Sequence, residues 1–269
     1  MLLRLFICLC LGSFVPAIFA QTLTFCYEDK ELAPSYMGTG LHVPDTRPGV
    51  SIEVLQMMEQ KIDGLSIDFI REPWQRCLHD MKRNKVDAVI ASYREERAAF
   101  MVYPTTQHGE LNTQLALNKF GRCIVGDKQF IKALASSKQS FSLAIPNGYS
   151  SAKNITDERF IKVDTLSQLD AYELVSKRVV DGTIGLCMIN EKVVKAFPFA
   201  KRLEAYHPPF DTSYGFLTYS KQFFKNNEIL AKELWEHLAE FPFAQVYMEY
   251  LGFEHQQIDS IIIDPEGSK

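Results

Sequence analysis

Hydrophobic positions in the first half of the chain alternate between the period of a strand and the period of a helix. Short apolar runs of strand length are separated by segments in which apolar residues recur at helical spacing, and Pro73 stands just before the second of these segments. This order predicts three parallel strands joined by right-handed helical crossovers. In chain order the expected elements are a strand at 23–27, a helix at 50–62, a strand at 65–70, a helix at 74–84 and a strand at 86–92.

The second half shows a similar arrangement. The expected strands are 114–119, 141–146, 183–189 and 214–219, and the expected helices are 128–135, 166–178, 228–238 and 243–251. Ser150 and Ser151 follow a strand and a Gly148 turn, where serine suits a helix N-cap. Two α/β halves joined by the strands at 114–119 and 214–219 predict two lobes with a cleft, and small ligands bind in such clefts.

The chain begins with the pattern of a secretory signal. Arg4 gives a positive start, Leu5–Leu11 is apolar, and Ala20 is a small residue before the expected cut. We therefore expect 1–20 to be a cleaved signal peptide and the protein to be exported to the periplasm. No later segment approaches the ~20 apolar residues of a membrane-spanning helix. We expect the first lobe to comprise 22–112 plus 214–262, and the second to comprise 113–213.

Charge and cysteine content narrow the classes of function that the protein could have. The formal net charge of −4 at pH 7 gives no electrostatic reason to bind nucleic acid. Beyond residue 20 the cysteines are Cys26, Cys77, Cys123 and Cys187, which allow two disulfides in three pairings or four buried free thiols. Pairing within lobes favours Cys26 with Cys77 and Cys123 with Cys187. The absence of C-x-x-C spacing and the scattered histidines predict no metal site, and we expect no cofactor.

The stretch Val86–Pro104 carries the most informative candidate chemistry. It combines a buried strand, a polar turn that ends at Arg97, and a second apolar run. A guanidinium just beyond a strand end can meet a carboxylate through two parallel hydrogen bonds, and ligands of open α/β sheets sit at the carboxyl ends of strands. The stretch therefore indicates capture of a small anionic or zwitterionic molecule. A surface Arg97 paired with Glu95 or Glu96 is the alternative that these residues leave open.

At these residues the chain resembles the extracytoplasmic (periplasmic) solute-binding proteins of family 3, the amino-acid-type substrate-binding proteins of ABC transporters. The resemblance covers about 23–253. Matching positions are Asp87 at the strand start, Ser92 near its end, the turn with Arg97, the Tyr103-Pro104 pair, Trp74 and the Gly148-Tyr149-Ser150 turn. It implies a type II clamshell in which each lobe is a mostly parallel sheet flanked by helices, with two crossing strands as the hinge.

The resemblance also implies a role for each candidate ligand-binding residue. Arg97 is expected to clamp a carboxylate, Ser92 to donate to the same group, Trp74 to cover a flat part of the ligand, Glu28 to accept from an amine or hydroxyl, and Tyr149 and Ser150 to contact the ligand from the second lobe. For four of these residues a structural alternative stays open. Trp74 could pack on the core, Glu28 could pair with a surface lysine, Tyr149 could be an exposed turn residue, and Ser150 could be only an N-cap.

One departure from the family pattern concerns the ligand. Leu186 stands about where many amino-acid binders place an Asp that holds the α-ammonium, so a standard free α-amino acid is in doubt. We expect a monomer, not an enzyme, that binds a small polar, carboxylate-bearing solute such as an amino acid or a related compound. It would deliver this solute to the membrane permease of an ABC importer. The alternatives are a dehydratase-like enzyme with Glu28 as acid or base, and a module that presents ligand to a membrane sensor.

Overall fold

The computed structural model describes residues 21–196 and 199–251, and the expected signal peptide lies outside these residues. A ten-stranded mixed sheet runs through the molecule in the order β2-β1-β3-β10-β5-β8-β6-β7, with β4 paired to β10 and β9 to β8. The strands are β1 Gln21–Glu28, β2 Leu65–Glu72, β3 Ala88–Ser92, β4 Met101–Val102, β5 Asn118–Asp127, β6 Phe141–Pro146, β7 Phe160–Thr165, β8 Gly182–Ile189, β9 Lys192–Ala196 and β10 Leu203–Ser220. None of the helices in this part of the chain is long and apolar enough to cross a bilayer.

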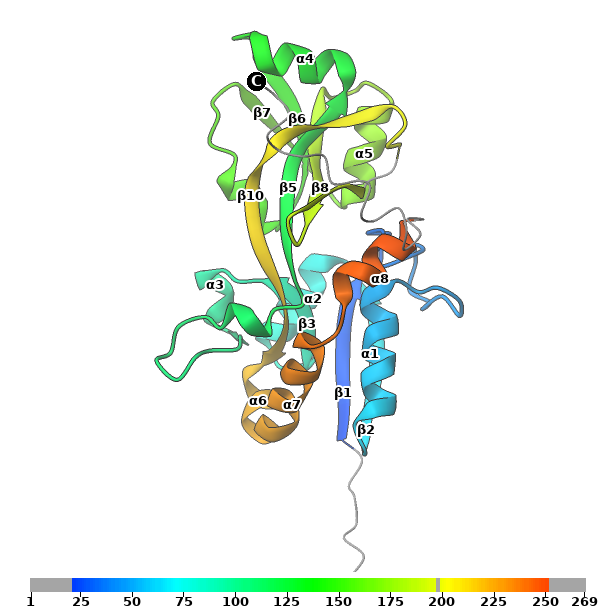
Figure 1. Ribbon diagram of the computed structural model, residues 1–269, viewed down its shortest axis with the longest axis vertical. Coiled ribbons are helices and arrows are strands. Elements are labelled where there is room, and N and C mark those ends of the chain that lie inside the picture. Colours follow the sequence, from blue (N-terminus) through cyan, green and yellow to red (C-terminus); the bar gives the residue numbers. More distant parts are fainter. Residues whose placement is uncertain (1–20, 197–198, 252–269) are drawn as a thin grey trace, which may run out of the picture.

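Helices cover the sheet in two separate groups (Figure 1). They are α1 Val50–Lys61, α2 Trp74–Lys82, α3 Glu95–Ala98, α4 Lys128–Ser136, α5 Gln168–Ser176, α6 Lys221–Asn226, α7 Glu228–Ala239 and α8 Phe243–Tyr250, with 3-10 turns η1 Thr113–Leu115 and η2 Ser150–Asn154. We call the part that contains β1–β4 lobe 1 and the part that contains β6–β9 lobe 2, the lower and upper parts of Figure 1. The predicted parallel pairings are present, β1 with β2 and β3 in lobe 1, and β6 with β7 and β8 in lobe 2.

The two strands that cross between the lobes are β5 and β10, which pair antiparallel. The prediction of a strand at 114–119 is wrong at its start. The Asn112 side chain accepts a hydrogen bond from the Gln114 amide and closes the 3-10 turn Thr113–Leu115, so the strand begins only at Asn118.

The second crossing strand, β10, is much longer than the predicted 214–219. It begins at Leu203 and continues through His207-Pro208-Pro209, which precede the predicted strand. A register shift against β5 between Tyr206 and Asp211 accommodates the prolines, because proline cannot donate to the ladder. This extension gives the crossing region its length.

Three further local expectations differ from the structure. Strand β7 has no clear predicted counterpart because five of its six residues are at least partly exposed, as is common at a sheet edge. The helix predicted from Leu166 begins at Gln168, since the Ser167 hydroxyl accepts from the Asp170 amide as its cap. The N-cap expected at Ser150 or Ser151 is absent, because η2 is capped at Tyr149 without a side-chain bond.

Two disulfides join elements within the lobes, in the pairing favoured above. Cys26–Cys77 connects β1 to α2 in lobe 1, and Cys123–Cys187 connects β5 to β8 at the base of lobe 2. All four cysteines are fully buried. The alternative of four free thiols is therefore wrong.

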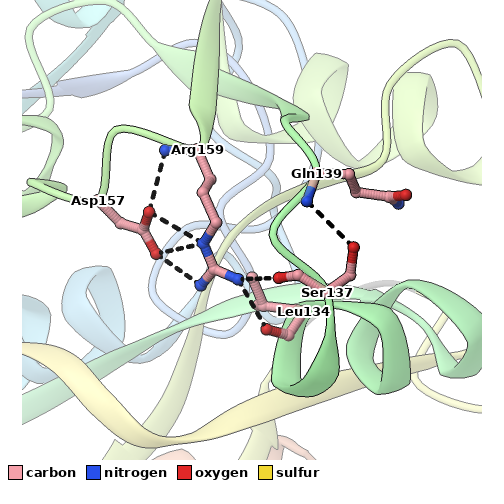
Figure 2. A network of polar contacts seen from close by, with 5 residues as sticks. All are labelled: Leu134, Ser137, Gln139, Asp157 and Arg159. Atoms are coloured by element: carbon pink, nitrogen blue, oxygen red, sulfur yellow. Dashed lines mark hydrogen bonds and ion pairs between the residues drawn. The ribbon is translucent and has the colours of Figure 1, made fainter.

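An arginine fixes the end of α4 in lobe 2 (Figure 2). Arg159 donates from Nη1 to the carbonyls of Leu134 and Ser137 at 3.1 and 2.7 Å, and its Nη2 lies 2.7 Å from a carboxylate oxygen of Asp157. The amide of Gln139 donates to the Ser137 hydroxyl. These bonds satisfy carbonyls that the helix end leaves unpaired, and they tie α4 to the start of β7.

Candidate functional site

A cavity of about 170 Å³ lies between the lobes, where side chains of both lobes and of the two crossing strands meet. Its lining includes Arg97, Ser92, Trp74, Glu28 and Tyr149, five of the six residues expected at a ligand site. Such sites are ~300–1,000 Å³ for drug-sized ligands, so this cavity suits a smaller molecule.

Arg97 is the central polar group of this cavity on the lobe 1 side. The short helix α3 places it there, and only 8% of the residue is exposed. Its Nη1 donates to the Ser92 carbonyl at 3.1 Å and its Nη2 to the Gly148 carbonyl of lobe 2 at 3.0 Å. The guanidinium also lies 5.5 Å from the centre of the Trp74 ring.

No described carboxylate lies in ion-pair contact with Arg97. The alternative of a surface pair with a neighbouring glutamate is wrong, since Glu96 pairs with Lys153 of lobe 2 instead. Burial is the main cause that lowers the pKa of Arg97, followed among the lowering causes by the positive charges of Arg94 and Arg122. The cavity therefore holds a buried cation that lacks an anionic partner among the described residues, which is an energetically costly arrangement.

Ser92 and Trp74 lie beside Arg97. Ser92 ends β3, and its Oγ is 3.3 Å from the Oγ of Ser213 on β10, while its carbonyl also accepts from the Tyr103 hydroxyl at 3.0 Å. Trp74 begins α2, so its ring faces the cavity from the N-terminal end of that helix.

Glu28 faces the same cavity from the end of β1. The residue is 4% exposed, and its Oε2 accepts from the hydroxyl of Tyr149 at 2.9 Å. Burial raises the pKa of Glu28 to about 7, and the bond from Tyr149 acts in the opposite direction. The interpretations of Glu28 as a partner of a surface lysine and of Tyr149 as an exposed turn residue are therefore wrong.

The side chain of Ser150, the sixth expected residue, lies outside the described part of the structure, so its ligand contact stays a prediction. Ser150 is the first residue of η2, and the next residue of this turn, Ser151, lines the cavity. Ser151 is 1% exposed, and its Oγ has no hydrogen-bond partner among the described residues. The turn expected to contact a ligand from lobe 2 therefore lies at the cavity.

Arg122 is the main residue that the sequence reasoning missed. It lies on β5, donates from Nη1 to the Ser213 hydroxyl at 2.7 Å, and stands 3.5 Å from a carboxylate oxygen of Asp211. The predicted strand stopped at Lys119, so nothing placed Arg122 on a crossing strand. Arg122 could have been found from the alternation of side chains along a strand. Phe120 and Arg122 are two residues apart, so they share one strand face, and both line the cavity.

Most of the remaining wall is uncharged, although Glu31 also lines the cavity. Lobe 2 contributes Ile184, Gly185 and Leu186 of β8. Leu186, the residue that stands about where the resemblance would place an Asp, therefore faces the cavity. Aromatic rings supply much of the rest, namely Tyr36, Phe120, Tyr172 and Tyr247. The cavity thus has a cationic side and an aromatic side that also carries Glu28.

No family model matches the chain, and no curated protein matches it in sequence. Solved structures do. An amino acid ABC transporter substrate-binding protein from Streptococcus pneumoniae, bound to L-arginine, aligns with a TM-score of 0.62 at 14% identity, over 89% of this chain and 94% of that chain. The substrate binding protein of another amino acid ABC transporter gives 0.62 at 12% identity, over 86% and 97%. A histidine kinase sensor domain with similarity to periplasmic binding proteins gives 0.61 at 12% identity, over 86% and 95%.

The chain has the clamshell fold of the periplasmic binding proteins. Contacts between described residues join the two lobes of this clamshell around the cavity. They include the hydrogen bond from Tyr149 to Glu28, the bond from Arg97 to the Gly148 carbonyl, and the ion pair of Lys153 with Glu96. Because cavity residues themselves make two of these contacts, a change in the contact between the lobes would also change the wall of the cavity.

Proposed function

We propose that the protein binds a small carboxylate-bearing solute in the interlobe cavity and delivers it, in the periplasm, to the membrane permease of an ABC importer. The observation that carries this proposal is the buried Arg97 guanidinium without an anionic partner among the described residues. A ligand carboxylate would supply the missing negative charge, and charge-assisted hydrogen bonds to arginine are the strong ones. The similar structures are named as binding proteins of amino acid ABC transporters, which supports the transport role.

In this proposal Arg97 and the Ser92 hydroxyl hold the ligand carboxylate. Trp74 covers an apolar part of the ligand, Glu28 accepts from a ligand amine or hydroxyl, and Tyr149 contacts it from lobe 2. The protein acts as a monomer whose lobes, 22–112 with 214–262 and 113–213, close on the ligand.

The test is a thermal-shift screen of the protein against amino acids, other carboxylates and amines, followed by calorimetry on the ligands found. We expect Arg97→Gln to weaken binding of the best carboxylate by about 10–100-fold, because a hydrogen bond to a charged group contributes about 1.5–3 kcal/mol. The exposed Arg83 on the C-terminal side of α2 supplies the matched control Arg83→Gln. A screen without a carboxylate ligand, or an Arg97→Gln protein with unchanged affinity, would contradict the proposal.

A sensor role is a second candidate, because a histidine kinase sensor domain is among the similar structures. In that case the loaded protein presents its ligand to a membrane receptor instead of a permease. Crosslinking of the ligand-loaded protein to its partner in membranes distinguishes the transport role from the sensor role. Recovery of a permease supports transport, and recovery of a sensor kinase supports signalling.

An enzyme on this scaffold is favoured by one observation, the pKa of Glu28 at about 7, which suits a general acid or base at neutral pH. The ligands found in the screen can be incubated with the protein and followed by NMR. Turnover that is lost in Glu28→Gln would support a dehydratase-like activity. Ligands recovered unchanged would support binding alone.

A further inference from the structure

The cavity contains hydrogen-bond donors that the proposed carboxylate site on Arg97 does not use. Arg122 projects from β5 into the lining, and only its Nη1 has described polar partners, Ser213 and Asp211. Its Nε and Nη2 donate to no described residue, although arginine offers five N–H groups in a fixed planar fork. The side chain is 23% exposed.

Ser151 provides a second, independent observation on the lobe 2 side. Its hydroxyl is almost completely buried, lines the same cavity and has no hydrogen-bond partner among the described residues. Buried hydroxyls are normally hydrogen-bonded, so an unpartnered one at a cavity wall needs an explanation. A ligand atom that accepts from it is the simplest one.

Asp211 connects these two groups. It is the cross-strand neighbour of Arg122, and its Oδ1 accepts from Nδ2 of Asn154 at 2.5 Å. Asn154 lies in the same short turn, η2, as Ser151. Asp211 therefore holds the Arg122 strand and the Ser151 turn together on one side of the cavity.

The charges are not balanced around these groups. Arg97 has no described carboxylate in ion-pair contact, while Arg122 has Asp211 at 3.5 Å, which is beyond hydrogen-bond distance and which also bonds to Asn154. A chain of contacts from Arg97 through Ser92 and Ser213 to Arg122 links the two guanidinium groups. One ligand carboxylate on Arg97 leaves Nε and Nη2 of Arg122 without acceptors among the described residues.

We propose that Arg122 and Ser151 form a second anion subsite, so that the preferred ligand is a small dicarboxylate with one acidic group on Arg97 and the other on Arg122. This inference rests on the proposed function, because it specifies which ligands the same cavity prefers. A cavity of about 170 Å³ restricts such a diacid to a short chain. The neutral wall at Leu186 agrees with a ligand that needs no partner there for an α-ammonium group.

The test compares diacids with their monoamides by calorimetry, because the amide keeps size and hydrogen bonding but removes one charge. The probes are succinate against succinamate and glutarate against glutaramate. We expect at least one diacid to bind about tenfold or more tightly than its monoamide, since hydrogen bonds to charged groups are roughly twice as strong as neutral ones. Arg122→Gln should reduce this ratio to about threefold or less, and Ser151→Ala should weaken diacid binding by about fivefold. Arg83→Gln should keep the full ratio.

The outcomes separate this inference from the function on which it rests. Equal affinity for diacid and monoamide in the wild type, or a monocarboxylate that binds more tightly than every diacid, overturns the second subsite while the carboxylate site on Arg97 stands. A protein that binds no carboxylate at all overturns the proposed function itself. If Arg122→Gln does not fold, as judged by its thermal transition, the wild-type ratio and Ser151→Ala still decide the question.

Discussion

At the scale of single residues, the cavity contains two buried ionisable groups of opposite sign that do not pair with each other. Arg97 donates to carbonyls, and Glu28 accepts from Tyr149. Neither arrangement gives the charge a counterion among the described residues, so both groups reduce the stability of the unliganded protein. An unpaired buried charge of this kind is typical of sites that bind charged ligands, because the bound ligand supplies the missing counterion.

The raised pKa of Glu28 predicts a specific pH dependence. Its pKa is about 7 in the folded protein against an ordinary value of 4.5, so between these values the folded state binds more protons than the unfolded state. Stability from this group is therefore complete below pH ~4.5 and is lost as the pH rises through ~7, by about 3 kcal/mol at most.

The measurement is the melting temperature of wild type and Glu28→Gln between pH 4.5 and 8. We expect the variant to gain about 5–10 °C relative to the wild type across this range, because glutamine does not ionise. The exposed Glu236 on α7 gives the control Glu236→Gln, which should follow the wild type. A difference between wild type and Glu28→Gln that does not change with pH would contradict the assignment.

The sequence identified most of this site because its residues stand directly at the ends of recognisable elements. Glu28 ends β1, Ser92 ends β3 and Trp74 begins α2. The turn at Ser150 and Ser151 was located too, but the sequence indicates a regular helix start where the chain forms a 3-10 turn. Arg122 was missed because the extent of a strand through a hinge depends on pairing with a distant strand, which local pattern does not contain.

At the scale of elements, the turn after β6 meets α2 of the other lobe very closely. Gly148 has φ +78°, and a Cβ at this position would lie 1.7 Å from Nε2 of Gln75. The carbonyl of Gly148 also accepts from Arg97. The glycine thus serves both a left-handed turn and the approach of the two lobes.

Replacement of this glycine should disfavour lobe contact. We expect Gly148→Ala to weaken ligand binding by about fivefold, because its Cβ would displace the end of the flexible Gln75 side chain between the lobes, at the lower end of the ~1–3 kcal/mol cost of overpacking. Gly109→Ala is the matched control, since Gly109 has φ +81° but no atom within 4 Å of the position that a Cβ would occupy. It should lower stability slightly and leave affinity unchanged. Equal effects of the two substitutions on affinity would contradict the role of Gly148 in lobe contact.

The alternating order of strands and helices was predictable because each buried strand and amphipathic helix has a strong local pattern. β6 was predicted with its observed bounds, and α1 within one residue. Two segments were not predicted from the sequence, the exposed edge strand β7 and the proline-containing part of β10. In both, pairing with a distant strand overrides the local preference of the residues.

At the scale of the whole molecule, each lobe has a disulfide that fixes its sheet. The bridges close segments with sequence separations of 51 and 64 residues. In the chain-entropy model such loops correspond to about 4 kcal/mol each.

We expect replacement of either cysteine pair by alanine to lower the free energy of unfolding by about 2–5 kcal/mol, measured by urea denaturation. Reduction of the wild type under the same conditions should have an effect at least as large. Unchanged unfolding midpoints in both double variants would contradict a structural role for the bridges.

The two α/β halves of the sequence predicted two lobes with a cleft. They did not predict the contacts that hold the two lobes together. The contacts that join the lobes, such as Tyr149 with Glu28 and Lys153 with Glu96, connect positions more than fifty residues apart, and no local pattern specifies them. These contacts bring the two lobes together around the cavity in which Arg97 is buried.

The decisive measurement is the crystal structure of the protein with the tightest ligand of the screen. We expect a ligand carboxylate between the lobes, about 2.7–2.9 Å from the guanidinium nitrogens of Arg97. A ligand bound elsewhere, or a ligand in the cavity while Arg97 contacts only the carbonyls of Ser92 and Gly148, would contradict this expectation.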